Sequence, residues 1–138
     1  SQFEQAVSDL HKRNIPVITH LILGLPGETK EDMLSSVRYV GSLPVTGIKL
    51  QLLHILKGTY LGTAYMADPF PLFTLEEYCD LIADCIALLP PEIVIHRLTG
   101  DGPRNLLLAP LWSTHKKRVL NTIQKCLRER DLWQGKNI

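Results

Sequence analysis

Residues 17–29 read VITHLILGLPGET, and this stretch decides the fold. Its first seven residues, Val17 to Leu23, are rich in β-branched and large apolar side chains on both faces, which is typical of a strand buried in a parallel sheet. The run that follows, Gly24 to Gly27, predicts a turn. Thr29 is then a suitable N-cap for a helix over residues 30–41. The stretch therefore predicts a strand, a turn and a helix in succession, the repeating unit of parallel α/β folds.

The same alternation continues along the chain on both sides of this stretch. Apolar residues recur at helical spacing in some segments, and short β-rich runs lie between them. In chain order, we expect a helix over residues 2–13, a strand over 17–23, a helix over 30–41, a strand over 48–55, a long loop over 56–73, a helix over 75–89, a strand over 92–98, a short helix ending at 108 and a final helix over 114–131. Strands that alternate with helices pair in parallel through right-handed crossovers. The sequence therefore predicts an α/β fold with three parallel strands and flanking helices.

Polar residues mark where these helices begin. Thr74 opens a Thr-Leu-Glu-Glu capping box, Asp101 could cap the short helix, and Ser113 is the expected cap of the final one. A leading helix followed by only three strands fits either a small three-layer domain or a segment of a larger (β/α) barrel.

The composition argues against several classes of protein. The 138 residues carry a formal net charge of +1, which argues against general attraction to nucleic acids or membranes. No apolar run reaches the roughly 20 residues that a membrane span needs, and the first residues do not resemble a signal peptide. Cys79, Cys85 and Cys126 form neither a disulfide framework nor a zinc motif. We expect a cytoplasmic protein with reduced thiols.

The charges are unevenly distributed along the chain. Residues 68–92 hold six acidic residues and no Lys or Arg, whereas residues 113–138 hold seven basic residues and two acidic ones. These segments could be two helix faces that lie against each other. Alternatively, the basic segment could bind a nucleic acid, although Trp133 is its only aromatic side chain after the Ser113 cap.

Several runs of residues resemble those of radical SAM enzymes. GLPGET, residues 24–29, is similar to a segment of oxygen-independent coproporphyrinogen oxidases and elongator-type proteins. HRLTGDGP, residues 96–103, and APLWS, residues 109–113, are more specific and resemble the bacterial YhcC-type radical SAM proteins. Further runs that fit this group are IKLQLLH at 48–54, LKGT at 56–59 and WQG at 133–135.

This resemblance implies a partial barrel of TIM type, (β/α)6. In that family, a CxxxCxxC loop after the first strand holds a [4Fe–4S] cluster, and S-adenosylmethionine is cleaved there to a 5′-deoxyadenosyl radical. The loop is absent from this chain. Residues 1–138 would then be one domain, the C-terminal half of the barrel plus a helical extension. Its partner would be the N-terminal half of the barrel. The fragment alone would be inactive and would bind neither the [4Fe–4S] cluster nor S-adenosylmethionine. The resemblance does not identify the substrate.

The resemblance assigns part of the S-adenosylmethionine site to Ile22, Gly24, Gly27 and Glu28. In radical SAM enzymes, a GxIxGxxE pattern on the fifth strand packs on the adenine ring, and a glycine lets a flat ring approach the backbone closely. Ile22 and Gly24 match the middle of this pattern, whereas His20 replaces its first glycine and Glu28 lies one residue late. The same residues would also make an ordinary strand-to-helix turn.

Residues near the ends of the second and third strands are candidates for binding a substrate or an anion. The glycines of the TGDGPR loop, residues 99–104, free backbone N–H groups, and two arginines offer planar donors. We expect one of these arginines to pair with Asp101, and the loop could equally be a structural turn built on that pair. The candidates are His54, Lys57, Arg97, Asp101 and Arg104.

One histidine lies on each predicted strand, at His20, His54 and His96. Three converging imidazoles could bind zinc. A lone histidine in an apolar strand is more often a hydrogen-bonded core residue, so we expect no metal site in this chain.

Two functions of other classes remain open from the residues alone. The Gly-Asp-Gly-Pro loop could make the chain a small anion-binding module, and the basic last helix could make it an RNA-docking domain. We also expect self-association, most simply as a dimer, because Val17–Leu23 would be an edge strand with no Lys and no internal Pro to protect it.

Overall fold

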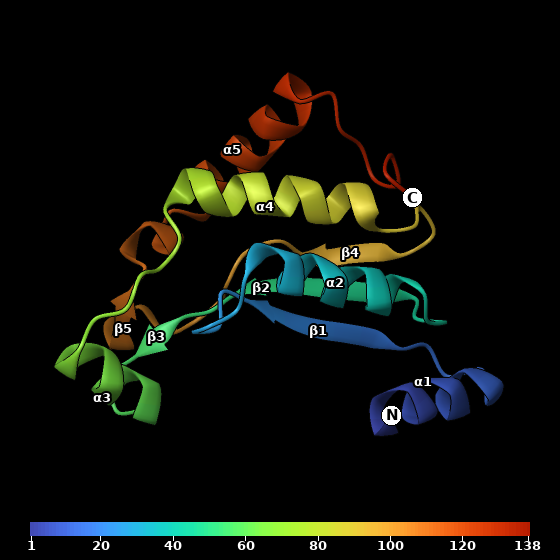
Figure 1. Cartoon of the computed structure of the whole chain (residues 1–138), viewed down its shortest axis with the longest axis horizontal. Coiled ribbons are helices and arrows are strands. Elements are labelled where there is room, and N and C mark those ends of the chain that lie inside the picture. The colour runs from blue at the N-terminus through green and yellow to red at the C-terminus, as the bar shows by residue number, and fades with distance from the viewer.

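A three-stranded parallel sheet with helices on one face forms the centre of the computed structural model, which describes all 138 residues (Figure 1). The elements are α1 (Gln2–Lys12), β1 (Ile18–Leu23), α2 (Lys30–Gly41), β2 (Gly47–Leu52), β3 (Ile55–Leu56), α3 (Tyr60–Ala67), α4 (Leu75–Leu88), β4 (Val94–Arg97), β5 (Leu107–Ala109) and α5 (Lys116–Glu129). Two 3₁₀ turns, Arg104–Leu106 and Leu111–Thr114, flank β5. The predicted α/β class with three parallel strands and flanking helices is confirmed.

The strand order in the sheet is β1-β2-β4, with both pairs parallel. β1 pairs with β2 over its whole length, from Ile18 opposite Gly47 to Leu23 opposite Leu52. β4 is shorter, and its register with β2 shifts between Ile48 and Lys49. The edges of the sheet are therefore β1 and β4.

The helices cover only one face of the sheet. In β1, Thr19 and Leu23 are buried, whereas the alternate residues Ile18 and Ile22 remain 43% and 44% exposed. Because successive strand residues point to opposite faces, the open face carries Ile18, His20 and Ile22. Val17–Leu23 is thus apolar on both faces, as the sequence indicates, but only one of these faces is buried in this chain.

The hydrophobic core lies between the sheet and helices α2 and α4, and α5 packs on α4 (Figure 1). Large core side chains that are fully buried come from every layer, among them Leu23, Val37, Leu50, Ile82 and Ile123. Tyr78 is also buried, and its hydroxyl donates to the Leu98 carbonyl at 2.7 Å. Burial raises the pKa of this phenol, so that it stays neutral.

The acidic and basic segments meet where α4, α5 and α2 come together. Arg130, just after α5, donates to Asp80 at 2.6 Å and to Asp84 at 2.5 Å, and Lys30 of α2 reaches Asp84 at 2.7 Å. The expectation that the two oppositely charged segments lie against each other is confirmed for these residues.

The long loop expected over residues 56–73 contains structure that the sequence did not indicate. Thr59 caps the short helix α3 by accepting from the Gly62 N–H at 2.9 Å. β3 pairs with β5 in a small antiparallel sheet, so the expected strand 48–55 divides into β2 and β3. β5 also replaces the end of the expected short helix, which is reduced to a 3₁₀ turn. Pairing between segments about 50 residues apart leaves no local periodicity in the sequence, which is why it was missed.

The final helix begins later than expected. Its N-cap position is His115, which makes no side-chain capping bond, whereas the Ser113 hydroxyl donates to the Pro110 carbonyl at 2.7 Å. The predicted Ser113 cap is therefore wrong. Thr29 and Thr74 do cap α2 and α4, each in a complete capping box.

None of the helices combines the length and the apolar character that crossing a membrane requires.

Candidate functional site at the carboxyl ends of the strands

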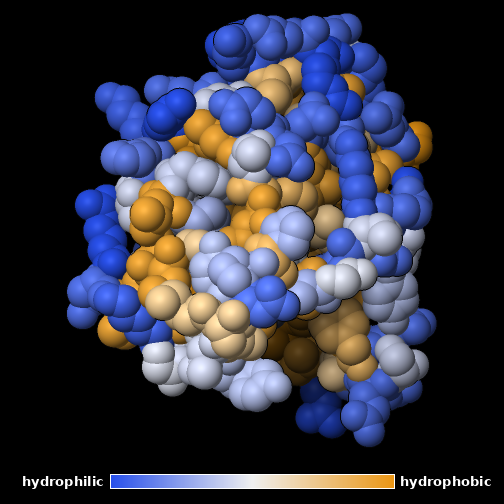
Figure 2. Space-filling view, turned by 60° about the vertical axis from the view of Figure 1, so that its left-hand side comes forward, coloured by the Kyte–Doolittle hydropathy of each residue, from blue (hydrophilic) through white to orange (hydrophobic).

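The carboxyl ends of β1, β2 and β4 point toward α3 and the β3–β5 sheet (Figure 1). Figure 2 brings this side of the molecule forward and shows apolar side chains at the surface between hydrophilic ones. In parallel α/β folds and barrels, functional residues gather at this end of the strands. The loops after β1, β2 and β4 are therefore the expected location of a functional site, and they carry the candidate residues.

The turn after β1 has a close neighbour. Gly24 has a φ of +94°, and a Cβ there would come within 3.1 Å of the Phe73 ring. The Phe73 ring in turn lies 6.1 Å from Tyr78, and the Phe73 carbonyl accepts from the Trp112 indole N–H at 3.0 Å. The close approach that the sequence assigned to a cofactor ring at Gly24 is thus made by an aromatic side chain of the chain itself.

A cavity of about 350 Å³ lies beside this turn. Gly24, Gly27 and Glu28 line it together with Lys30, Phe73 and other residues of the turn, α2, α4 and the segment before α4. One carboxylate oxygen of Glu28, Oε2, is buried and accepts no hydrogen bond. Because a buried acceptor without a donor is unfavourable, Glu28 is suited to a donor supplied by another molecule or segment. Ile22, the fourth predicted residue, lies on the open face of β1 and does not line this cavity.

The Gly-rich loop after β4 encloses His54. A Cβ on Gly100 would lie 2.2 Å from Nε2 of this imidazole, and a Cβ on Gly102 would lie 2.7 Å from Nδ1. Nε2 is buried without a hydrogen-bond partner. Burial lowers the pKa of His54, against the opposing effect of Asp101 and with a further lowering by Lys116. The two glycines are therefore needed to make room for a neutral imidazole, a role different from the free N–H groups that the sequence suggested.

Asp101 connects the loop to two cations. Lys116 Nζ donates to Asp101 Oδ1 at 2.8 Å, and Arg97 Nη2 lies 3.6 Å from Oδ2. The hydrogen bond and charge of Lys116, and then the charge of Arg97, hold the pKa of Asp101 below its usual range. The expected pairing of an arginine with Asp101 is confirmed for Arg97. Lys116 is a residue that sequence reasoning missed, because it follows Asp101 by 15 positions and no spacing rule connects them.

Arg104 lines a cavity of about 260 Å³ together with His54, Asp101 and Lys116, whereas Lys57 lies outside this group. Arg104 donates to the Thr114 carbonyl at 2.9 Å, and it does not pair with Asp101. Lys57 is exposed, and its side chain makes neither a hydrogen bond nor an ion pair, although its backbone N–H donates to the Leu106 carbonyl at 2.8 Å. The structure thus brings together four of the five candidates, which are His54, Arg97, Asp101 and Arg104.

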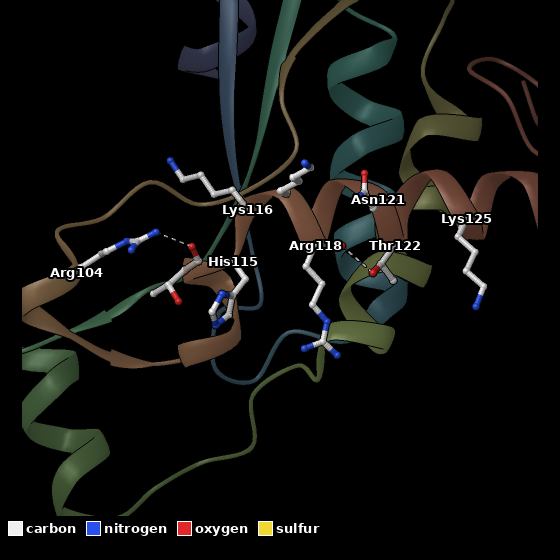
Figure 3. Close-up of a pocket in the computed structure, with 9 residues that line it drawn as sticks. Arg104, His115, Lys116, Arg118, Asn121, Thr122 and Lys125 are labelled. Carbon is white, nitrogen blue, oxygen red and sulfur yellow. Dashed lines mark hydrogen bonds between the residues drawn. The ribbon is translucent and has the colours of Figure 1, made fainter.

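A cationic groove of about 750 Å³ runs along the start of α5 (Figure 3). Figure 3 shows Arg118 and Lys125 extending from the same side of the helix, with Arg104 approaching the helix start from the preceding loop. No hydrophobic and no acidic residue lines this groove. Its lining residues are Arg104, Thr114, His115, Lys116, Lys117, Arg118, Asn121, Thr122 and Lys125.

The structure contains no group of three or more His, Cys, Asp or Glu side chains placed to hold a metal ion. His20 and His96 lie exposed on the open face of the sheet, whereas His54 lies beneath the Gly-rich loop. Cys79 and Cys85 are buried in α4, and burial raises the pKa of each thiol to about 12. These two cysteines are therefore buried, protonated thiols at neutral pH.

Comparisons with known proteins agree with this architecture. A protein-family model, the Radical_SAM C-terminal domain, matches residues 45–129. YtqA of Bacillus subtilis is 40% identical over 134 residues, which are 97% of this chain and 42% of that protein. YhcC of Escherichia coli K12 is 33% identical over 127 residues, 92% of this chain and 41% of that protein. The chain therefore spans about two fifths of the length of these curated relatives.

A solved structure has the same fold. It is the Elp3 protein of the archaeon Methanocaldococcus infernus with an N-terminal deletion, and it superposes with a TM-score of 0.74. The match covers 95% of this chain and 32% of that one, at 17% sequence identity. At this identity the likeness concerns the fold alone.

Proposed function

Because the chain belongs to the radical SAM family and represents the C-terminal domain of its YhcC type, we propose that the intact protein is a radical SAM enzyme and that this chain forms one wall of its S-adenosylmethionine site. Two observations carry the proposal: Glu28 lines the cavity beside the turn after β1, and its Oε2 atom is buried without a hydrogen-bond donor. This cavity lies at the carboxyl ends of parallel strands, where such sites are built.

The residues of this cavity fit the proposed cofactor. S-adenosylmethionine carries an ammonium group and ribose hydroxyls, which are donors of the kind that Glu28 lacks. Bound beside a [4Fe–4S] cluster, this cofactor would supply radical chemistry for removing a hydrogen atom from a substrate. The cluster would be held by residues outside this chain, because Cys79, Cys85 and Cys126 do not converge.

The chain would bind and orient the cofactor and exclude water from it. Glu28 would accept a hydrogen bond at the cavity, whereas Ile22, which does not line the cavity, lies on the open face of the sheet. The open face, with Ile18, His20 and Ile22, would become the interior of the barrel once the N-terminal half covers it. This arrangement gives the uncovered face a partner within the same protein.

A group of side chains after β4, formed by His54, Arg97, Asp101 and Lys116, would lie at the same end of the barrel. Arg97 and Lys116 hold Asp101 in place, and the loop keeps His54 neutral and enclosed. Because His54 Nε2 is buried, the members of this cluster that a substrate could reach are the partly exposed Arg97 and Asp101. We assign this cluster to the substrate side of the site.

The alternative of a separate small-anion-binding module receives less support. Its proposed glycines enclose His54, and its Asp101 is engaged by two cations of the chain. The charge of Asp101 is therefore already balanced within the fold, although a cavity of about 260 Å³ remains beside the loop.

The test uses the intact protein, reconstituted anaerobically with iron and sulfide. The wild type should bind S-adenosylmethionine and cleave it to 5′-deoxyadenosine under reduction. Glu28→Gln should weaken binding about ten- to a hundredfold, because a hydrogen bond to a charged group contributes about 1.5–3 kcal/mol. Glu31→Gln is the matched control, since Glu31 is exposed and pairs only with Arg38 at 2.7 Å. Absence of 5′-deoxyadenosine from the wild type would refute the reaction, and equal binding by both variants would refute the role of Glu28.

A further inference from the structure

We propose that the cationic groove at the start of α5 binds the phosphodiester backbone of a nucleic-acid strand. The inference goes beyond the proposed reaction, because it names a macromolecular ligand and a surface that shares no residue with the cavity beside the turn after β1. It rests on the composition, the charge and the length of the groove.

The composition of the groove is that of a phosphate-binding surface. Six of its nine lining residues are Arg, Lys or His, and the other three are Thr114, Asn121 and Thr122. Backbone contacts in protein–nucleic acid complexes come from Arg and Lys, and from hydroxyl and amide side chains. The groove therefore offers both kinds of donor, and none of its lining residues is acidic.

Most of this positive charge is not neutralised within the fold. Arg104, Lys117 and Arg118 form no ion pair, whereas Lys116 pairs with Asp101 and Lys125 lies 3.7 Å from Glu129. Outside the groove, by contrast, Arg130 and Lys30 are both neutralised by ion pairs with Asp84. Like charges that gather without counter-ions repel one another, and an anionic ligand relieves that repulsion.

The near-neutral net charge of +1 does not oppose this interpretation. In the acidic segment 68–92, Asp80 and Asp84 form ion pairs with Arg130, and Asp84 also pairs with Lys30. Neither cation lines the groove. Binding to a polyanion depends on the local charge of the surface that it contacts.

The length of the groove favours a polymer over a single phosphate. Arg118 and Lys125 are seven residues apart and extend from the same side of α5, so they span about 10 Å along the helix axis (Figure 3). One strand of a duplex carries a phosphate about every 3.4 Å along its axis, so this distance spans about three or four phosphates. Arg104 extends the positive surface beyond the helix start (Figure 3).

The test measures the affinity of the intact protein for fluorescently labelled RNA and DNA strands of one sequence, about 12 nucleotides long, at several salt concentrations. Lys117→Gln combined with Arg118→Gln removes two unpaired cations from the groove. The slope of log affinity against log salt should become shallower by about 1.4, since each lost contact to a single strand contributes about 0.7. Comparison of the two strands shows whether the bound backbone belongs to RNA or DNA.

The matched control is Lys12→Gln combined with Arg13→Gln, which removes the same charge from exposed positions at the end of α1. It should retain the wild-type slope. Gln is a good helix former, so the groove variant should keep its unfolding temperature, which is measured in parallel. Glu28→Gln should leave strand binding unchanged, which separates this proposal from the proposed reaction.

Three outcomes would overturn the proposal. In the first, the wild type binds neither strand. In the second, the groove variant has the same salt slope as the control. In the third, polyglutamate binds to the wild type as tightly as the oligonucleotides do. The last outcome would mean that the surface attracts any polyanion.

Discussion

Gly100 illustrates how a single residue acquires its role from a side chain 46 positions away. Because a Cβ on Gly100 would lie 2.2 Å from His54 Nε2, Gly100→Ala must displace the imidazole or the loop. We expect Gly100→Ala to lower the free energy of unfolding by about 1–3 kcal/mol, the usual result of overpacking. The clash is absent from the double variant Gly100→Ala/His54→Ala. Its loss of unfolding free energy should therefore be smaller than the sum of the losses in the two single variants. Urea unfolding of the four proteins measures this coupling, and strictly additive losses would contradict the contact.

Asp84 should make the stability of the fold depend on pH. Burial alone would raise the pKa of this carboxyl group, but hydrogen bonds and charges from Lys30 and Arg130 outweigh burial and lower it. A carboxyl whose pKa is lower in the folded state stabilises the fold above its ordinary pKa of about 4, and this contribution disappears as the pH falls through the lowered value. We expect Asp84→Asn to be less stable at pH 7 and to lose less stability than the wild type between pH 5 and pH 2. Urea midpoints across this range test it, with the exposed Asp131→Asn as a control that should behave as the wild type.

At the scale of the element, the starts of the helices are where local sequence has its clearest effect. Thr74 accepts from the Glu77 N–H at 3.1 Å, and the Glu77 carboxylate accepts from the Thr74 N–H at 3.2 Å. We expect Thr74→Ala to reduce the free energy of unfolding by about 1 kcal/mol, because a helix N–H then loses its acceptor. Thr74→Ser retains the hydroxyl and should keep most of the stability. Thermal unfolding distinguishes the two, and equal losses would show that the methyl group of Thr74, and not its hydroxyl, is responsible.

At the scale of the whole molecule, the open face and the β1 edge predict self-association of the isolated chain. Ile18, Ile22 and Val94 are 43%, 44% and 56% exposed on the face that no helix covers, and β1 has an unpaired edge. Unpaired strand edges and exposed apolar patches promote association. We expect a dimer at micromolar concentration in sedimentation velocity experiments, through this edge or this face.

A pair of variants tests which surface is responsible. Ile18→Lys combined with Ile22→Lys places two charges on the open face and should shift the isolated chain toward monomer. Tyr60→Lys is the control, because Tyr60 is 91% exposed on α3 and lies away from the sheet. A wild-type chain that stays monomeric would mean that this face needs no partner.

Structural features that depend on neighbouring residues could be predicted from the sequence alone. The β-rich run before Gly24 predicted β1, and the Thr29 and Thr74 capping boxes predicted where α2 and α4 begin. The alternation of helices and strands predicted the parallel sheet. These features follow from backbone preferences and hydrogen bonds within a few residues, so they can be recognised in the order of the residues alone.

The tertiary structure decided the features that join distant segments. It paired β3 with β5, placed Lys116 on Asp101 and used Gly100 and Gly102 to enclose His54. It also gathered Arg104 and the first turns of α5 into one cationic groove, whereas the sequence showed only an excess of basic residues near its end. Such contacts depend on how the chain packs in three dimensions, and no local periodicity or spacing records them.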